Sequence, residues 1–292
     1  MKKLFLSIAI ALTPLGFIIG AFIAWQLGTS FVAPANHPIG APPADLQAIT
    51  VSITTPENET VSGWFANGNA GGGAVLLLHG VRSDRTQMLA RARLLRNAGY
   101  AVLLIDLHAH GESSGAAITF GAREAQGVSA AINYLQQQLP REKIGIVGAS
   151  LGAASAVLAK PEGRVQAMVL ESMFPTIDDA IANRVAMPFG KIGYAAAPLL
   201  LMQLPLRLGV WPSELRPINA LPTLTMPVLI ASGAQDAHTT WAETQRIFDA
   251  ANQPKTLWKV EGAGHVDLQQ FNPALYDSTV LSFLNHHLKQ NR

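Results

Sequence analysis

The feature that most constrains the fold is a pentapeptide, GASLG, at residues 148–152. It follows an apolar run, Ile144 to Val147, and precedes a helix-favouring stretch that runs to Lys160. A strand that passes directly into a helix must turn sharply, and small residues around Ser150 permit such a turn. The turn pushes the serine hydroxyl out of the sheet, so Ser150 is a candidate nucleophile. The alternative is an ordinary tight turn, because glycine and serine also meet by chance in a chain with 25 glycines.

Two polar residues further along the chain are suited to activate this serine. A serine hydroxyl is a poor nucleophile near neutral pH unless an imidazole accepts its proton and a third group orients that ring. The strand-like run 227–232 leads into a loop with Asp236, and the strand-like run 256–260 leads into a loop with His265. Open parallel sheets place their active sites in such loops. We therefore predict a catalytic triad of Ser150, Asp236 and His265.

The order serine, aspartate, histidine along the chain is the order found in the α/β-hydrolase family, which residues 50 to 290 resemble. In addition to the GxSxG motif, a buried strand runs into residues 79–81, which are similar to the family's HG turn. The resemblance implies an oxyanion hole formed by the backbone N–H groups of Val81 and Leu151. It also implies a mostly parallel central sheet with helices on both faces.

A second turn also resembles the family but departs from its pattern. Residues 101–113 are similar to the family's strand and DxRGxGxS turn. His108 stands where an arginine is usual, and Ala109 stands where a glycine is usual. The departure concerns the geometry of this turn and not the triad.

The chain contains eight histidines, of which we expect one to act as the base. His238 is the main alternative, but it lies only two residues after Asp236 and does not follow the last strand. We therefore favour His265. The others are assigned to structural turns, to the linker or to the end of a helix that starts at about residue 273: His37, His79, His108, His110, His286 and His287.

The acid also has an alternative. Glu171 ends the apolar run 167–170, a position that some hydrolases of this fold use for their acid. A structural carboxylate is the other interpretation of Glu171, and Asp236 fits the loop after the next strand better. Asp178 and Asp179 are expected to open a helix, where acidic side chains favour the N-terminal dipole.

Composition indicates one packed catalytic domain with an anchor. A chain of 292 residues with 49% hydrophobic content can bury a large core as a single α/β unit. It has no cysteine, which excludes disulfides, thiolate metal sites and a cysteine nucleophile. The formal charge is +2 with 14% charged residues, so nucleic acid is not expected as a partner. The predicted chemistry needs no metal or organic cofactor.

Residues 4–27 form an uncharged, mostly apolar run behind Lys2 and Lys3. As a helix this run would be about 36 Å long, which is enough to cross a hydrocarbon core of about 30 Å. A cleaved signal peptide is the alternative, because Ala33-Pro34-Ala35 offers a small-x-small site, but signal h-regions span only about 7 to 15 residues. We predict an uncleaved, single-pass anchor in the inner membrane. The two lysines stay in the cytoplasm, which places the catalytic domain in the periplasm.

The predicted organisation is an anchor at residues 1–27, a proline-rich linker at 28–47 and the α/β-hydrolase domain at 48–292. The linker composition is typical of an extended, semi-rigid spacer. The domain opens with an antiparallel hairpin formed by runs 51–54 and 61–65, after which strands and helices alternate. At about 175–221 this alternation gives way to an apolar segment, which we interpret as a cap over the site.

The leading functional hypothesis is a serine hydrolase that cleaves carboxylic esters through an acyl-enzyme intermediate, on acyl or lipid-like substrates. A thioesterase or a peptidase is the alternative on the same triad. A non-catalytic, membrane-tethered binding module with the same fold is the alternative from another class. A dehalogenase or an epoxide hydrolase would need a carboxylate in place of Ser150.

Overall fold

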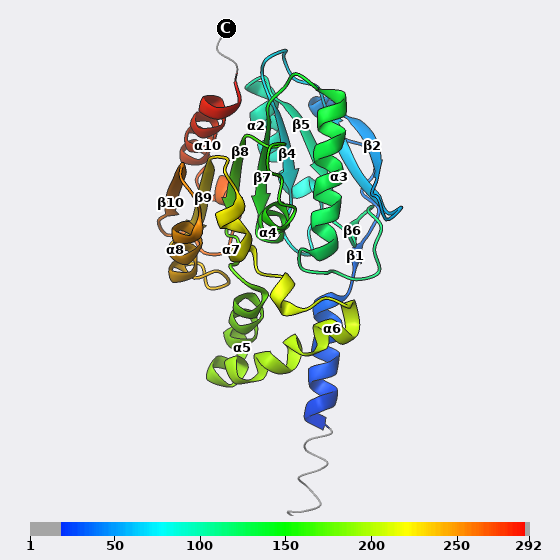
Figure 1. Cartoon of the computed structure of the whole chain (residues 1–292), viewed down its shortest axis with the longest axis vertical. Coiled ribbons are helices and arrows are strands. Elements are labelled where there is room, and N and C mark those ends of the chain that lie inside the picture. Colours follow the sequence, from blue (N-terminus) through cyan, green and yellow to red (C-terminus); the bar gives the residue numbers. More distant parts are fainter. Residues whose placement is uncertain (1–18, 290–292) are drawn as a thin grey trace, which may run out of the picture.

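The computed structural model describes residues 19–289 and is built on an eight-stranded sheet (Figure 1). The strands lie in the order β10-β9-β8-β7-β4-β5-β3-β2. Strand β3 runs antiparallel to both of its neighbours, and all other pairs are parallel. This is the predicted α/β-hydrolase sheet with its opening hairpin. The strands are β2 (Ile49–Thr54), β3 (Thr60–Ala66), β4 (Ala74–Leu78), β5 (Ala101–Ile105), β7 (Ile144–Ala149), β8 (Ala167–Glu171), β9 (Val228–Gly233) and β10 (Lys255–Val260).

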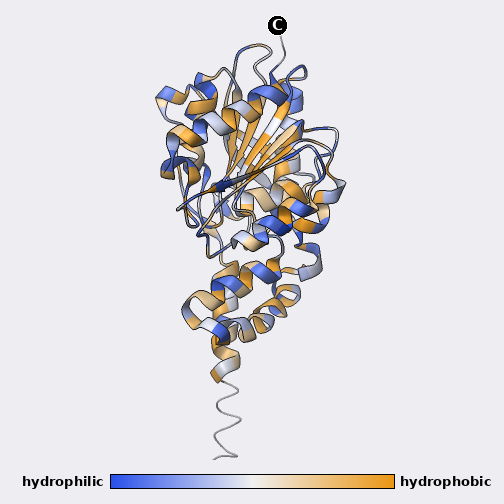
Figure 2. Ribbon diagram, turned by 90° about the vertical axis from the view of Figure 1, so that its left-hand side faces the viewer, coloured by the Kyte–Doolittle hydropathy of each residue, from blue (hydrophilic) through white to orange (hydrophobic). Residues whose placement is uncertain are grey.

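Helices cover both faces of the sheet, so its central strands are buried on both sides. The sequences AVLLL of β4 and AVLLI of β5 have no exposed residue, as expected of strands in a covered parallel sheet (Figure 2). Successive side chains enter opposite cores, because a strand turns its side chains alternately to its two faces. One core includes α3 (Ala122–Gln138), α4 (Leu151–Leu158) and α8 (Trp241–Ala250), and the other includes α2 (Leu89–Asn97) and α10 (Pro273–Leu288).

A cap replaces the regular strand-helix alternation between β8 and β9. It consists of α5 (Ile177–Leu201), α6 (Gln203–Leu208), α7 (Pro217–Ala220) and two 3-10 turns, Pro212–Glu214 and Leu221–Thr223. The Thr176 side chain caps α5, and the expected acidic residues occupy its first turn. The helix is kinked at Gly190, where φ is 54° and ψ is −136°. The cap lies at the lower end of the domain, beside the N-terminal helix (Figure 1).

The N-terminal helix, Ile19–Val32, extends five residues beyond the predicted end of the anchor at residue 27. Residues 1–18 of the predicted anchor lie outside the described residues. Within residues 19–289, the one helix long and apolar enough to cross a membrane is the kinked stretch Ile177–Leu208, and Ile19–Val32 is apolar but shorter. Length and composition alone are weak indications of a span, since core helices and signal sequences share them.

The linker differs from the predicted spacer, because it is fixed along the surface of the domain. Its strand β1 (Ala35–Asn36) pairs in parallel with β6 (His110–Gly111). The backbone N–H groups of Ile39 and Gly40 donate to one carboxylate oxygen of Glu112 at 2.9 and 3.0 Å. Proline content predicted an extended backbone but not these partners, which lie more than 70 residues away.

Substitution of Gly152 tests how closely α4 must approach the sheet. A Cβ atom there would lie 2.5 Å from the Leu78 carbonyl oxygen and 2.7 Å from that of His79. Both are backbone atoms, so the strand or the helix would have to move. We expect Gly152→Ala to lower the free energy of unfolding by about 1–3 kcal/mol, measured by urea denaturation. Gly264→Ala is the control, since its Cβ would meet only the Gln235 carbonyl oxygen at 3.8 Å. Equal losses in both variants would contradict this account of the turn.

Candidate active site

Ser150 stands in a strained turn between β7 and α4. Its backbone has φ 50° and ψ −110°, a conformation that side-chain-bearing residues rarely adopt and that costs about 1–3 kcal/mol. The Ser150 N–H donates to the carbonyl of Glu171 at 2.8 Å, which ties the turn to β8. A Cβ atom at Gly148 would lie 2.7 Å from the backbone nitrogen of Ala153. Glycine is therefore required on both sides of Ser150 by close contact, in agreement with the GxSxG pattern.

His265 and Asp236 are joined by a hydrogen bond. The Nδ1 atom of His265 lies 2.8 Å from a carboxylate oxygen of Asp236, whose side chain is fully buried. The other oxygen of Asp236 accepts from the N–H groups of His238 and Thr239 at 2.8 and 2.9 Å. Burial acts to raise the pKa of Asp236, but these hydrogen bonds outweigh it and the pKa is lowered. The ionised carboxylate holds the proton on Nδ1 and leaves Nε2 free to accept another.

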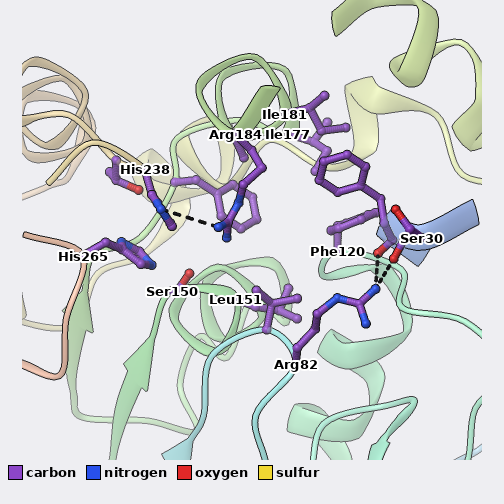
Figure 3. A pocket seen from close by; sticks show the side chains of 15 residues that line it. Ser30, Arg82, Phe120, Ser150, Leu151, Ile177, Ile181, Arg184, His238 and His265 are labelled. Atoms are coloured by element: carbon purple, nitrogen blue, oxygen red, sulfur yellow. Dashed lines mark hydrogen bonds between the residues drawn. The ribbon is translucent and has the colours of Figure 1, made fainter. Parts of the chain in front are cut away.

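Ser150 and His265 face a shared space at the carboxyl ends of β7 and β10 (Figure 3). Both residues line two adjoining cavities, of about 490 Å³ and about 180 Å³. Among the hydrogen bonds of the described residues, none joins the Ser150 hydroxyl to the His265 ring. Such a bond is often long before substrate binds and shortens in the reacting complex. The structure thus brings the three predicted triad residues together around one site, with the His265–Asp236 pair already formed.

Two backbone N–H groups beside Ser150 are free to bind an oxyanion. Within residues 19–289, neither Val81 nor Leu151 donates its N–H to another group of the protein, although the N–H groups of Gly80, Arg82 and Ser150 all do. Leu151 is the first residue of α4, where backbone N–H groups have no partner inside the helix. Val81 and Leu151 both line the larger cavity. These are the donors that the sequence predicted for an oxyanion hole.

Two neutral histidines connect the loop of Val81 to the loop after β5. The Nε2 atom of His79 accepts from the Leu107 N–H, and the Nε2 atom of His110 accepts from the Arg82 N–H, each at 3.0 Å. Each ring therefore carries its proton on Nδ1, next to the carbonyl oxygens of Gly80 and His108. Burial lowers the pKa of His110, and it lowers the pKa of His79 to about 3. Neither ring lines the cavities at Ser150, so both are structural.

The second turn keeps its form despite its departure from the family pattern. Ala109 has φ 58°, in the left-handed region that favours the usual glycine. Its N–H donates to the Ser114 carbonyl at 2.8 Å, and its own carbonyl accepts from the linker residue Ala35 at 2.8 Å. The ring of His108 is paired with Glu59 at 2.9 Å. Hydrogen bonds from the linker and from the neighbouring loop thus stabilise the left-handed conformation of Ala109, which a glycine would adopt more easily.

Glu171, the alternative acid, belongs to another network. Its carboxylate accepts from the guanidinium of Arg91 at 2.6 and 3.2 Å and from the Tyr276 hydroxyl. Arg91 also pairs with Asp267 at 2.7 Å. Since His265 is hydrogen-bonded to Asp236 and not to Glu171, the geometry favours Asp236 as the orienting acid.

His238 and Arg184 lie in the site in positions that the sequence did not indicate. The His238 ring stacks on His265, with ring centres 4.4 Å apart and planes 25° apart. Arg184 of α5 approaches Nε2 of His238 at 3.5 Å and lines both cavities (Figure 3). Burial, then the neighbouring His265 and Arg184, lower the pKa of His238 to about 4. Among the described residues, no group bonds to the buried Nδ1 of His238, so no carboxylate orients this ring as a base. The neutral ring of His238 packs against His265 instead.

The two cavities differ in character. The larger one is lined mainly by apolar side chains, and the smaller one mainly by polar groups. The residues that line the larger cavity include Phe31, Phe120, Phe174, Ile177, Ala180 and Ile181; those of the smaller include Gln87, Arg91, Glu171, Ser172 and Asp267. Within the described part of the chain, no group of three or more histidine, aspartate or glutamate side chains is placed to hold a metal ion.

Comparison with known proteins agrees with this architecture. A model described as "Alpha/beta hydrolase family" matches residues 75–276. The uncharacterized protein Rv2307c of Mycobacterium tuberculosis is 29% identical over 79% of this chain and 75% of its own, and YqkD of Bacillus subtilis is 26% identical over 73% and 71%. The solved esterase Pf2001 of Pyrococcus furiosus is 26% identical and superposes with a TM-score of 0.73 over 88% of this chain and 98% of its own. These likenesses support hydrolase activity.

The protonation of His238 can be tested by NMR of the imidazole rings. Because its folded pKa is about 4 and its ordinary value is 6.5, we expect no titration of this ring between pH 8 and pH 5. The unfolded chain binds this proton and the folded chain does not, so the folded state loses stability as the pH falls from about 6.5 towards 4. His37 serves as the internal control, since the Ala35 carbonyl and then Asp84 raise its pKa above 6.5. A His238 midpoint at or above that of His37 would contradict the assignment.

Proposed function

The chain belongs to the α/β-hydrolase family, and we propose that it is a membrane-anchored serine hydrolase that cleaves carboxylic esters of lipid-like acyl groups. The observation that carries the proposal is the Asp236–His265 hydrogen bond beside Ser150 and two unpaired backbone N–H groups. A nucleophile, an oriented base and oxyanion donors are the parts that acyl transfer needs. The related Pyrococcus furiosus protein, an esterase by name, supports the ester as the bond cleaved.

The proposed reaction proceeds in two steps. The Ser150 oxygen attacks the acyl carbon while Nε2 of His265 takes its proton, and the negative charge on the carbonyl oxygen is held by the N–H groups of Val81 and Leu151. The carbon–oxygen ester bond then breaks, and His265 returns the proton to the departing alcohol. Water attacks the acyl-serine in the same way and releases the carboxylic acid. Asp236 remains ionised throughout and stabilises the imidazolium that forms twice in each cycle.

The two cavities support a division between the acyl chain and the alcohol. The larger, mainly apolar cavity of about 490 Å³ suits an acyl chain, and the smaller, mainly polar one of about 180 Å³ suits a hydroxyl-bearing alcohol. In the smaller cavity, the Ser172 hydroxyl is buried and has no hydrogen-bond partner among residues 19–289. A thioester or an amide could react at the same three residues, and a parallel assay of matched acyl esters, thioesters and amides distinguishes them.

We also propose that residues 1–27 anchor the chain in the inner membrane with the domain in the periplasm. The charges of Lys2 and Lys3, followed by an uncharged stretch up to residue 44, support this orientation. The apolar helix Ile19–Val32 is consistent with the outer part of such an anchor.

Substitution of the triad tests the proposed mechanism. On p-nitrophenyl butyrate, we expect Ser150→Ala and His265→Asn to lower kcat by at least about 1,000-fold. Asp236→Asn should lower it by a comparable factor, because the amide no longer holds the proton on Nδ1. Stopped spectrophotometric assays of each purified full chain give these values.

The controls separate catalysis from folding. Ser155→Ala removes a buried hydroxyl of α4 that donates only to the Leu151 carbonyl, at 2.7 Å, and should keep activity within about threefold of wild type. Glu171→Gln weakens the buried pair with Arg91 and should lower thermal stability. If Ser150→Ala were as active as Ser155→Ala, the proposed reaction would be wrong. A wild-type chain inactive on every ester, thioester and amide would favour the binding module.

Chain-length preference tests the role of the larger cavity. Each methylene buried there contributes about 0.8 kcal/mol, so kcat/KM should rise about fourfold per added carbon until the cavity is full. Ala180 lines this cavity, and Ala180→Phe should move the optimum to shorter chains. Ala195→Phe is the matched control, because Ala195 is exposed on the same helix. A panel of p-nitrophenyl esters from acetate to palmitate provides the measurement, and an unchanged optimum in Ala180→Phe would place the acyl chain elsewhere.

A further inference from the structure

The cap is fastened to the N-terminal helix. The Gln203 side chain donates to the Ala24 carbonyl at 3.0 Å. Arg207 donates to the Trp25 carbonyl at 2.6 Å and to the Thr29 hydroxyl at 3.0 Å. Its guanidinium also lies 3.7 Å from the centre of the Trp25 ring, a close cation–π contact. These contacts from α6 hold the cap beside the last turns of the helix.

The fit between the two helices is tight. A Cβ atom at Gly28 would lie 2.2 Å from the side-chain oxygen of Gln203, whose side chain is buried. Next along the helix, the Ser30 and Phe31 carbonyls accept from Arg82, which follows the oxyanion donor Val81. The N-terminal helix therefore contacts both the cap and the loop that carries Val81 and Arg82, and the three form one connected unit.

The outer side of this unit is an exposed apolar surface. Most of the large apolar side chains that remain exposed in residues 19–289 lie on the N-terminal helix or between residues 187 and 211. We call the second group the outer cap face. In the helix they are Ile19, Phe22, Ile23 and Trp25; in the outer cap face they are Met187, Phe189, Ile192, Tyr194, Leu199, Met202, Leu206 and Trp211. Ile192 and Leu206 are 77% and 79% exposed, and so many large apolar side chains in contact with water are unfavourable.

The middle part of the cap carries charges of one sign. Between Asp179 and Glu214, which lie near the two ends of the cap, the chain contains no acidic residue, and its charged residues there are Arg184, Lys191 and Arg207. An apolar surface with cationic residues along it matches the interface of a membrane that contains anionic lipids. Tryptophan and tyrosine favour the same depth, and both occur on the outer cap face.

We propose that the outer cap face lies in the lipid interface of the membrane, beside the N-terminal helix. A lipid bilayer is the occupant that fits, because the helix is preceded in the sequence by the uncharged, apolar residues 4–18. A cap fastened to the outer end of a membrane-spanning helix meets the bilayer surface. The inference rests on the proposed anchor but not on the proposed ester chemistry.

The position of the cavity gives this surface a role. The larger cavity is lined by Phe31 at the end of the N-terminal helix and by Ile177 and Ile181 of α5. An acyl chain that leaves the lipid layer at the cap would thus reach Ser150 along apolar side chains, without crossing water. The membrane contact would supply the enzyme with lipid-like substrates and leave small water-soluble esters unaffected.

Depth-dependent fluorescence quenching tests the proposal on the full chain. The chain has no cysteine, so single cysteines can be introduced and labelled with an environment-sensitive fluorophore. Ile192→Cys and Leu206→Cys report on the outer cap face, and Phe22→Cys reports on the helix. Ile49→Cys is the control, since Ile49 is apolar and 60% exposed but lies on the edge strand β2. Each protein is reconstituted in vesicles of phosphatidylcholine and phosphatidylglycerol with brominated acyl chains.

We expect the brominated lipid to reduce the fluorescence at Ile192, Leu206 and Phe22 at least twofold and to leave the label at Ile49 unchanged. Quenching at Phe22 with none at the two cap positions would overturn the cap proposal while retaining the anchor. No quenching at Phe22 would remove the anchor and the cap proposal with it. None of these outcomes depends on hydrolysis, so an inactive chain that passes the test would refute the proposed chemistry alone.

Discussion

The turn at Ser150 is the constraint on which the rest of the structure depends. Ser150 has a positive φ, and the strand and the helix on its two sides approach so closely that only hydrogen atoms fit at Gly148 and Gly152. The same approach places the unpaired N–H of Leu151 at the start of α4. One backbone conformation therefore presents both the hydroxyl and an unpaired N–H group, the second of which is proposed to bind the oxyanion. The mostly parallel sheet brings the loops after β9 and β10 to the same edge, where Asp236 and His265 meet.

Electrostatics distinguish His265 from the other histidines of the core. His79, His110 and His238 are held neutral, because burial lowers the pKa of each. His265 differs from them because its Nδ1 lies 2.8 Å from a buried carboxylate oxygen of Asp236, which is the arrangement that the proposed base needs. The neutral rings bind backbone N–H groups or stack on His265, so they shape the site without competing for its proton. The two carboxylates are separated as well. Glu171 is paired with Arg91, and Asp236 is hydrogen-bonded to the His265 ring.

The sequence predicted those parts of the fold that depend on neighbouring residues. The buried strands, the opening hairpin and the acidic first turn of α5 follow from local patterns of apolar and acidic residues, and the structure confirms them. The position of Arg184 depends on how the kinked helix α5 packs over the sheet, which no local pattern predicts. The stacking of His238 on His265 joins two loops that follow different strands, so it could not be predicted either. The linker was expected to be an extended, semi-rigid spacer; its contacts with Glu112 and β6 could not be predicted, because these partners are distant in sequence. The contact between Arg207 and Trp25 could not be predicted either, because these two residues are also distant in sequence.

The central claim is that Ser150 is a nucleophile activated by His265. Treating the full chain with a fluorophosphonate and mapping the adduct by mass spectrometry tests it most directly, because the phosphorus centre reacts only with an activated hydroxyl. We predict a single adduct on Ser150, formed at least about 100-fold more slowly when His265 is replaced by asparagine. A chain that stays unmodified, or one that carries its adduct on another residue, would contradict the account.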